Sequence, residues 1–286
     1  MYLKLFFNIK FNKEIKLFEH LPNFLSSKAP KIYKNNCKNI NMIKYGHIWK
    51  TTSKSRNKLL IDWIDNYLNN NKNKYSLLEL GSSSGVSVFP ALKKKKKIKK
   101  YFLTDLQLVY YYKKLLAHTL LFSKKKSLIP FMAFNKILIF YSDNKSFNVI
   151  FNFASYLIRF ILSLLTLGIK KNYLYLLKNQ IIEYQKKYPI IFKEFNILSN
   201  WEYSKVDLII ALNLFNNSYF SEISMKKIVS NVYSILNNGG IIIIGDNKKK
   251  SKISVFKKIK GKFILTHNNG GQVESHDFFL NFFIKK

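Results

Sequence analysis

The sequence predicts an α/β fold built on an open, mostly parallel sheet. First, the apolar run Tyr75–Leu78 leads directly into a glycine-bearing turn, Gly81–Gly85. Second, Val206–Leu212 and Ile241–Ile244 are short, nearly continuous apolar runs, which are typical of parallel strands buried on both faces. Third, the segment between those two runs has the 3.6-residue apolar period of a helix. Alternating strands and helices of this kind form a sheet covered by helices.

The elements follow in order along the chain. Lys58–Leu68 is expected to be a helix that leads into the first strand. Tyr101–Asp105 is expected to be the second strand and ends in an acid. Gln180–Tyr188 has helical spacing, and Ile190–Phe195 after it is expected to be the third strand.

The last eighty residues contain the clearest pattern. Val206–Leu212 predicts a strand and Ser221–Leu236 a helix, which Asn237–Gly240 should end. Ile241–Ile244 then predicts a buried strand. Three closing strands are expected, with a Gly270-Gly271 turn between the last two: Val255–Lys258, Phe263–His267 and Phe278–Phe282.

The glycine loop disfavours one cofactor class. A dinucleotide fingerprint needs glycine at positions 81, 83 and 86. The chain has Gly81, Ser83 and Val86, so only one of the three positions fits.

An acid two residues before the loop points to another class. Glu79, Gly81 and Gly85 resemble motif I of the class I, Rossmann-like S-adenosylmethionine-dependent methyltransferases, with Ser83 in place of the middle glycine. The segment from Asn213 to Phe220 also resembles bacterial members of undefined substrate. The resemblance covers about residues 51–286. It implies a doubly wound, mostly parallel seven-stranded sheet with an antiparallel C-terminal hairpin, and S-adenosyl-L-methionine as the cofactor.

The resemblance also implies which residues hold that cofactor. The loop would pass under the methionine part, Asp105 would accept the ribose hydroxyls, and Asn196 would hold the adenine amino group. For Asp105 and Asn196, an ordinary strand-end aspartate and an ordinary loop asparagine are the alternatives. The full set expected at the cofactor is Glu79, Gly81, Ser82, Ser83, Gly85, Asp105, Leu106, Asn196, Ile197, Asn213 and Leu214.

The sequence does not identify a catalytic residue. His47 and Tyr219 are the candidates for a general base. His47 lies just before the helix that leads into the first strand, and Tyr219 lies just after the strand Val206–Leu212, so each could reach the cleft. Cys37 is the only cysteine, and no histidine pair has metal-ligand spacing, so no metal site is expected.

The formal net charge of +34 suggests nucleic acid as a partner. However, only Arg56 and Arg159 are arginines, and arginine is the preferred residue for reading phosphates and bases. The lysine run Lys93–Lys100 is more typical of a solvated helix end. An RNA methyltransferase therefore stays the second hypothesis.

Two segments lie outside this pattern. Residues 1–50 form a basic, aromatic extension with roughly helical spacing from Leu3 to Phe18 and no secretory signal. Residues 107–172 are an insertion after the second strand, in which Val149–Gly168 is almost wholly apolar. Arg159 near its centre opposes a membrane span. We expect one or two buried helices that form a lid, with a membrane-facing or acyl-binding lid as the alternative.

The leading functional hypothesis is a cytoplasmic methyltransferase that uses S-adenosyl-L-methionine and acts on a small-molecule or lipid-like acceptor. Peripheral contact with a membrane is compatible with it. A third hypothesis is a non-catalytic binding or membrane-surface protein on a methyltransferase scaffold.

Overall fold

A computed structural model describes most of the C-terminal half of the chain and parts of the rest. Its described residues are 8–10, 44–45, 48–49, 58–70, 74–83, 85, 92, 97–106, 108–115, 118–123, 128–134, 137–140, 157, 160–161, 164–170, 172–175, 184–185, 187–217, 219–246 and 250–283. They fall into two compact units. Unit 1 is drawn from Met1–Thr52 and Val109–Asn179, and unit 2 from Ser53–Leu108 and Gln180–Lys286.

Unit 2 contains a seven-stranded sheet. Its strand order is β11-β5-β4-β12-β13-β14-β15. The first five of these strands are parallel to one another, β14 is antiparallel to β13, and β15 is antiparallel to β14. The strands are β4 (Tyr75–Leu80), β5 (Ile98–Asp105), β11 (Ile190–Glu194), β12 (Val206–Leu212), β13 (Leu236–Asp246), β14 (Lys252–Ile259) and β15 (Lys262–Asn269). The structure confirms the predicted α/β fold with a mixed, mainly parallel sheet.

The order of the strands fixes where a ligand can bind. From β4 the chain adds β5 and β11 on one side, then returns to add β12 and β13 on the other side. The strand order therefore reverses between β4 and β12. In open α/β sheets, ligands bind outside the carboxyl ends of the strands at such a switch point.

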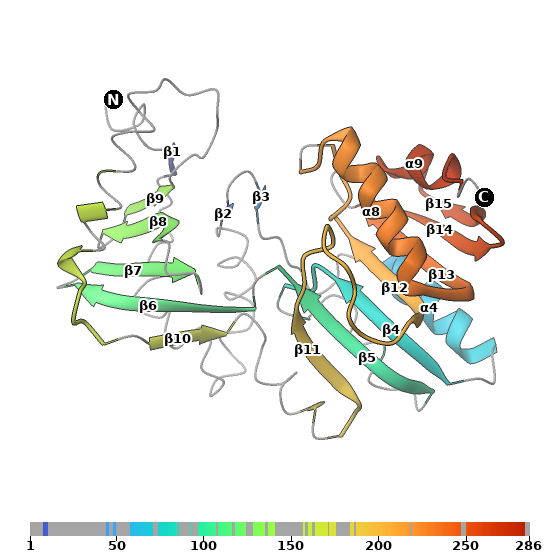
Figure 1. The fold of residues 1–286 in the computed structure, drawn as a ribbon, viewed down its shortest axis with the longest axis horizontal. Coiled ribbons are helices and arrows are strands. Elements are labelled where there is room, and N and C mark those ends of the chain that lie inside the picture. Colours follow the sequence, from blue (N-terminus) through green and yellow to red (C-terminus); the bar gives the residue numbers. More distant parts are fainter. Residues whose placement is uncertain are drawn as a thin grey trace. The chain divides into compact units, whose positions relative to one another are not determined.

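Helices cover both faces of this sheet. Helix α8 (Glu222–Ile235) and the short helix α9 (His276–Leu280) pack on one face, where Val229 and Phe279 are fully buried. Figure 1 shows α8 crossing β12 and β13 on this face. Helix α4 (Lys58–Asn70) packs on the other face through Leu60, Ile64 and Leu68. Unit 2 is thus a three-layer arrangement with the sheet in the middle.

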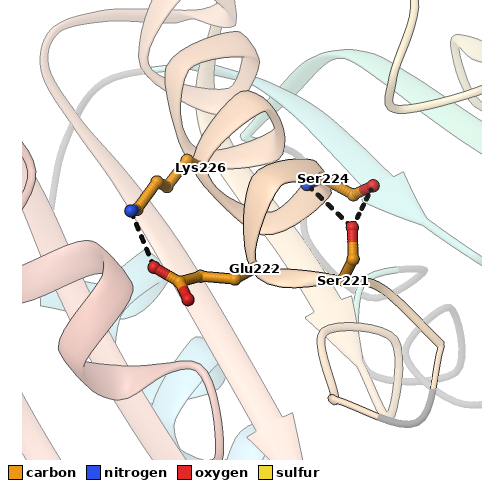
Figure 2. Close-up of polar contacts among 4 residues, drawn as sticks. All are labelled: Ser221, Glu222, Ser224 and Lys226. Atoms are coloured by element: carbon orange, nitrogen blue, oxygen red, sulfur yellow. Dashed lines mark hydrogen bonds and ion pairs between the residues drawn. The ribbon is translucent and has the colours of Figure 1, made fainter.

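Helix α8 begins where the sequence predicts. The Ser221 hydroxyl accepts a hydrogen bond from the backbone N–H of Ser224 at 3.3 Å, and the two hydroxyls lie 3.0 Å apart. Glu222 in the first turn pairs with Lys226 one turn later, at 2.7 Å (Figure 2). A serine cap and an acid in the first turn both satisfy or complement the unpaired N–H groups at a helix N-terminus.

One predicted strand of unit 2 is wrong. Phe278–Phe282 was expected to be a closing strand, but His276–Leu280 forms helix α9. Helical turns bring Phe279 and Phe282 to the same side, where both rings pack against Phe263. The antiparallel hairpin at the end of the sheet is therefore β14–β15, and it lies earlier in the chain than expected.

Unit 1 differs from the predicted helical insertion. Its described residues form a six-stranded sheet in the order β1-β9-β8-β7-β6-β10, with antiparallel neighbours, and a separate two-stranded pair, β2–β3. Short runs rich in tyrosine, phenylalanine and isoleucine favour strands over helices, which explains the difference. The strands are β1 (Asn8–Lys10), β2 (Lys44–Tyr45), β3 (Ile48–Trp49), β6 (Val109–Leu115), β7 (His118–Ser123), β8 (Leu128–Phe134), β9 (Ile137–Phe140) and β10 (Asn172–Tyr175).

Two further expectations for unit 1 need correction. Asn8–Lys10, which was expected to lie in a helix, pairs as a strand with β9. Within the apolar segment 149–168, residues 157, 160, 161, 164 and 165 are helical as expected, but their side chains are exposed and not buried. In the ranges that the structure describes, every helix is too short or too polar to cross a bilayer.

Candidate functional site

The loop after β4 has an unusual backbone. Gly81, Ser83 and Gly85 have φ values of 67°, 52° and 69°, all in the left-handed region. The loop is held by two backbone hydrogen bonds, from Ser82 N–H to the Thr104 carbonyl and from Gly85 N–H to the Ser82 carbonyl, both 2.8 Å. Glycine adopts such φ values without strain, whereas a serine at this position costs about 1 kcal/mol.

The acid at the end of β5 holds this loop in place. The backbone N–H of Ser83 donates to Oδ2 of Asp105 at 2.9 Å, and Asp105 is only 4% exposed. The neighbouring Thr104 hydroxyl donates to the Glu79 carbonyl at 2.8 Å. The loop and the predicted ribose acid therefore lie together at the carboxyl ends of β4 and β5.

Two hydroxyls in the loop are buried without hydrogen-bond partners. The side chain of Ser82 is 2% exposed and that of Ser83 is 7% exposed. Neither Oγ atom has a partner in the described structure. A buried unpaired hydroxyl costs about 1–3 kcal/mol, so natural proteins keep few of them. Such a pair in a glycine loop at a switch point indicates a polar ligand.

Glu79 is buried near the end of β4. The Tyr101 hydroxyl donates a hydrogen bond to Oε2 of Glu79. The pKa of Glu79 is raised from 4.5 to about 7, chiefly by burial, while the Tyr101 hydrogen bond lowers it and the charge of Asp105 raises it. The Glu79 carboxyl can therefore hold or release a proton near neutral pH.

The chain after β12 meets the loop from the other side of the switch point. A methyl group added at Gly81 would lie 3.4 Å from Cδ1 of Leu214. Asn213 has a φ of 51°, and its N–H donates to the Gly245 carbonyl at 2.8 Å. The left-handed turn at Asn213 thus redirects the chain so that Leu214 borders the loop.

The predicted adenine residues lie at the end of β11. Phe195 N–H donates to the Asp105 carbonyl at 2.9 Å, which brings this strand end beside β5. Asn196 is exposed, and its Oδ1 accepts a hydrogen bond from Leu198 N–H at 3.0 Å. Ile197 is 6% exposed and packs in the core under α8. Asn196 therefore stands at the edge of the site, and Ile197 contributes to the core.

The remaining candidate residues are Leu106, Tyr219 and His47. Leu106 directly follows Asp105 and is 47% exposed. Tyr219 lies in a turn that is closed by its N–H on the Asn216 carbonyl at 3.0 Å. His47 lies outside the described residues. Within the described part of the chain, no group of histidine, cysteine or acidic side chains could hold a metal ion.

Sequence reasoning missed Tyr101. Tyr101, Leu103 and Asp105 alternate along β5 and so share one face, and Glu79 pairs with Leu103 in the neighbouring strand. Tyr101 lies two residues before Leu103, the strand partner of the buried Glu79, so its hydroxyl is within reach of the Glu79 carboxyl. This spacing was the signal that could have found it.

Comparisons with known proteins give matches to solved structures only. No protein-family model matches the sequence, and no curated protein matches it. Among solved structures, the chain is similar to an S-adenosylmethionine-dependent methyltransferase from Clostridium acetobutylicum ATCC 824, with 12% identity, 80% of this chain and 79% of that chain covered, and a TM-score of 0.37. It is also similar to N-methyltransferase NodS from Bradyrhizobium japonicum WM9 in complex with S-adenosyl-l-homocysteine, with 11% identity, 74% and 71% covered, and a TM-score of 0.36.

A third similar structure is an O-methyltransferase family protein from Burkholderia thailandensis, with 10% identity, 66% of this chain covered and a TM-score of 0.32. This chain spans 37% of the length of that protein, which is less than two thirds. All three TM-scores lie below 0.5, so the fold class rests on the strand order and register of the sheet.

Proposed function

We propose that this protein is an S-adenosylmethionine-dependent methyltransferase that acts on a small-molecule or lipid-like acceptor. The observation that carries the proposal is the pair of buried, unpartnered hydroxyls of Ser82 and Ser83 in the loop that Asp105 fixes at the switch point. A ligand that accepts their hydrogen bonds would remove the cost of burying them.

The residues of the loop and its surroundings complement the chemistry of this cofactor. Its amino-acid end carries a carboxylate, which the hydroxyls of Ser82 and Ser83 and the loop N–H groups can bind. Its ammonium group is suited to Glu79 in the ionised form. Its ribose hydroxyls are donors, and Asp105 supplies a carboxylate at the end of β5, the usual place for that contact in such folds.

The remaining contacts are assigned to the neighbouring strand ends. Asn196 would hold the adenine amino group, because an amide oxygen has two lone pairs and can accept a second bond beside that from Leu198. We place Leu106 and Leu214, both near the loop, against the apolar parts of the cofactor. Asn213 would border the reacting end of the cofactor.

The cofactor, when bound, supplies a methyl group on a positively charged sulfur. The protein then has to hold the acceptor in line and exclude water. Leu214 lies in van der Waals reach of Gly81 and so places an apolar side chain beside the loop. No side chain has to act as a base where the acceptor is already a good nucleophile, so Tyr219 is kept only as a candidate.

A thermal-shift measurement with S-adenosylhomocysteine tests the proposal. At a ligand concentration about 100-fold above Kd, binding stabilises the folded state by about 2.7 kcal/mol, so the melting temperature should rise by several degrees. Adenosine at the same concentration is the control for weak binding of the nucleoside part alone. No shift at any concentration would refute the proposal.

A further inference from the structure

Unit 1 carries an exposed apolar surface that the proposed methyl transfer does not use. Six large apolar side chains between residues 157 and 167 are 45–70% exposed. We call them the apolar stripe: Leu157, Phe160, Ile161, Leu164, Leu165 and Leu167. The five from 157 to 165 are helical and spaced by three and four residues, so they share one face. Monomeric proteins seldom expose such a contiguous patch unless it binds something.

In this segment a polar side chain is buried and its apolar neighbours are exposed. Thr166 is fully buried, while its neighbours Leu165 and Leu167 are exposed. The buried Lys113 of β6 donates a hydrogen bond to the Thr166 carbonyl and so fixes this orientation. Backbone hydrogen bonds from Leu167 to Leu164 and from Ile169 to Thr166 close the turns around it. The backbone at the C-terminal end of the stripe is therefore held by specific contacts.

The charge of unit 1 indicates what would cover the stripe. The two segments of unit 1 contain 21 lysine and arginine residues against 3 acidic residues, which gives a formal net charge of 21 minus 3, or +18. Residues 109–179 contain a single acid, Asp143. Lys170, three residues after the stripe, is exposed. An apolar face on a strongly basic unit complements the surface of a lipid bilayer, which has an apolar interior beneath negatively charged headgroups.

Two other occupants fit less well. A second copy of the chain would bring another unit of +18 against the first, and like charges oppose that contact. RNA binds basic surfaces through stacking of its bases on aromatic rings. Five of the six residues of the stripe are aliphatic, with Phe160 the only aromatic one.

We propose that the apolar stripe docks unit 1 on the surface of an anionic lipid bilayer. The leucines would enter the boundary between headgroups and acyl chains, and the lysines would bind the negative headgroups. The docking does not depend on the proposed cofactor site, and each can fail without the other.

Vesicle flotation with the full chain tests this proposal. The probe is a phosphatidylcholine vesicle with or without phosphatidylglycerol. The wild-type chain should partition onto the mixed vesicles, less onto pure phosphatidylcholine, and less at higher salt. The double variant Leu165→Gln/Leu167→Gln keeps the net charge and should lose roughly tenfold or more in partitioning.

Ile223→Gln is the matched control, because Ile223 is 82% exposed on α8 of unit 2. Partitioning of this variant should equal that of the wild type, and thermal unfolding should show that all three proteins fold. Equal partitioning by the double variant would overturn the proposal, as would equal binding to neutral and anionic vesicles. Sedimentation showing a dimer that the double variant dissociates would assign the stripe to self-association instead.

Discussion

The backbone N–H of Ser83 and the carboxylate of Asp105 lie 2.9 Å apart, joined by a buried hydrogen bond. The two residues are 22 positions apart in sequence, and each follows or ends a different strand of the parallel sheet. This contact fixes the glycine loop over the end of β5. It also leaves the hydroxyls of Ser82 and Ser83 buried beside the switch point without partners.

The first prediction concerns these two hydroxyls. Without ligand, Ser82→Ala should raise the free energy of unfolding by about 1 kcal/mol, because it removes a buried unpaired group. Ser83→Gly should raise it by a similar amount, because it also relieves a left-handed serine. Affinity for S-adenosylhomocysteine should fall about tenfold in each variant, since a hydrogen bond to the ligand is lost.

Urea unfolding measures the stability, and titration calorimetry measures the affinity. Ser234→Ala is the control, because Ser234 is exposed on α8 and should change neither quantity by much. If Ser82→Ala lowered stability without ligand, its hydroxyl would have a structural role, and the assignment to a ligand would be wrong.

The second prediction concerns pH. The pKa of Glu79 is about 7 in the folded protein and 4.5 ordinarily, so between these values the folded state binds the extra proton. The stability that this carboxyl contributes is therefore complete below about pH 4.5 and is lost as the pH rises through about 7. Relative to Glu79→Gln, the free energy of unfolding of the wild type should fall by roughly 3 kcal/mol across that window.

Urea unfolding at a series of pH values tests this. Tyr101→Phe sharpens the test, because the Tyr101 hydrogen bond lowers the pKa of Glu79 and its loss should move the upper end of the window to higher pH. A wild type and a Glu79→Gln variant with parallel pH profiles would show that Glu79 is not buried as described.

The third prediction concerns Lys258, which lies at the C-terminal end of α8. Nζ of Lys258 donates to the carbonyls of Tyr233 and Leu236, at 2.6 and 2.7 Å, and lies 4.1 Å from the centroid of the Tyr233 ring. It thus binds the C-terminal end of the helix. Lys258→Met should lower the free energy of unfolding by about 2–4 kcal/mol, because two charge-assisted hydrogen bonds are lost. Lys257→Met, at the exposed neighbouring position, should cost less than about 0.5 kcal/mol in the same thermal or urea unfolding experiment.

Much of unit 2 could be predicted from the sequence, because in each element the apolar residues follow the spacing of either a strand or a helix. Buried parallel strands are continuous apolar runs, and Ile241–Ile244 and Val206–Leu212 both lie in such strands. The segment Phe278–Phe282 has no such period. Its rings could pack from a strand or a helix, and the contacts with Phe263 decide for the helix.

The insertion could not be predicted for a related reason. A long apolar stretch predicts burial, yet the six side chains of the apolar stripe are exposed while Thr166 is buried. The contact of Lys113 with Thr166 that sets this orientation joins residues 53 positions apart, and local pattern carries no information about it.

For the candidate site, the sequence predicts which residues lie near one another but not the contacts they make. The spacing of Glu79, Gly81 and Asp105 placed these residues at strand ends that adjoin in the sheet, and the structure brings them together. The Tyr101 hydroxyl on Glu79 could be found only once the register of β4 against β5 is known, and the role of Asn196 in its own turn depends on the direction of its side chain.

Titration calorimetry of the wild type and of Asp105→Asn with S-adenosylhomocysteine tests the central claim most directly. We predict one site per chain in the wild type and an affinity at least about tenfold lower in the variant, because the ribose contact and the tie to Ser83 are both weakened. A wild type that gives no binding heat and does not compete for the ligand, or a variant that binds as tightly as the wild type, would contradict the account.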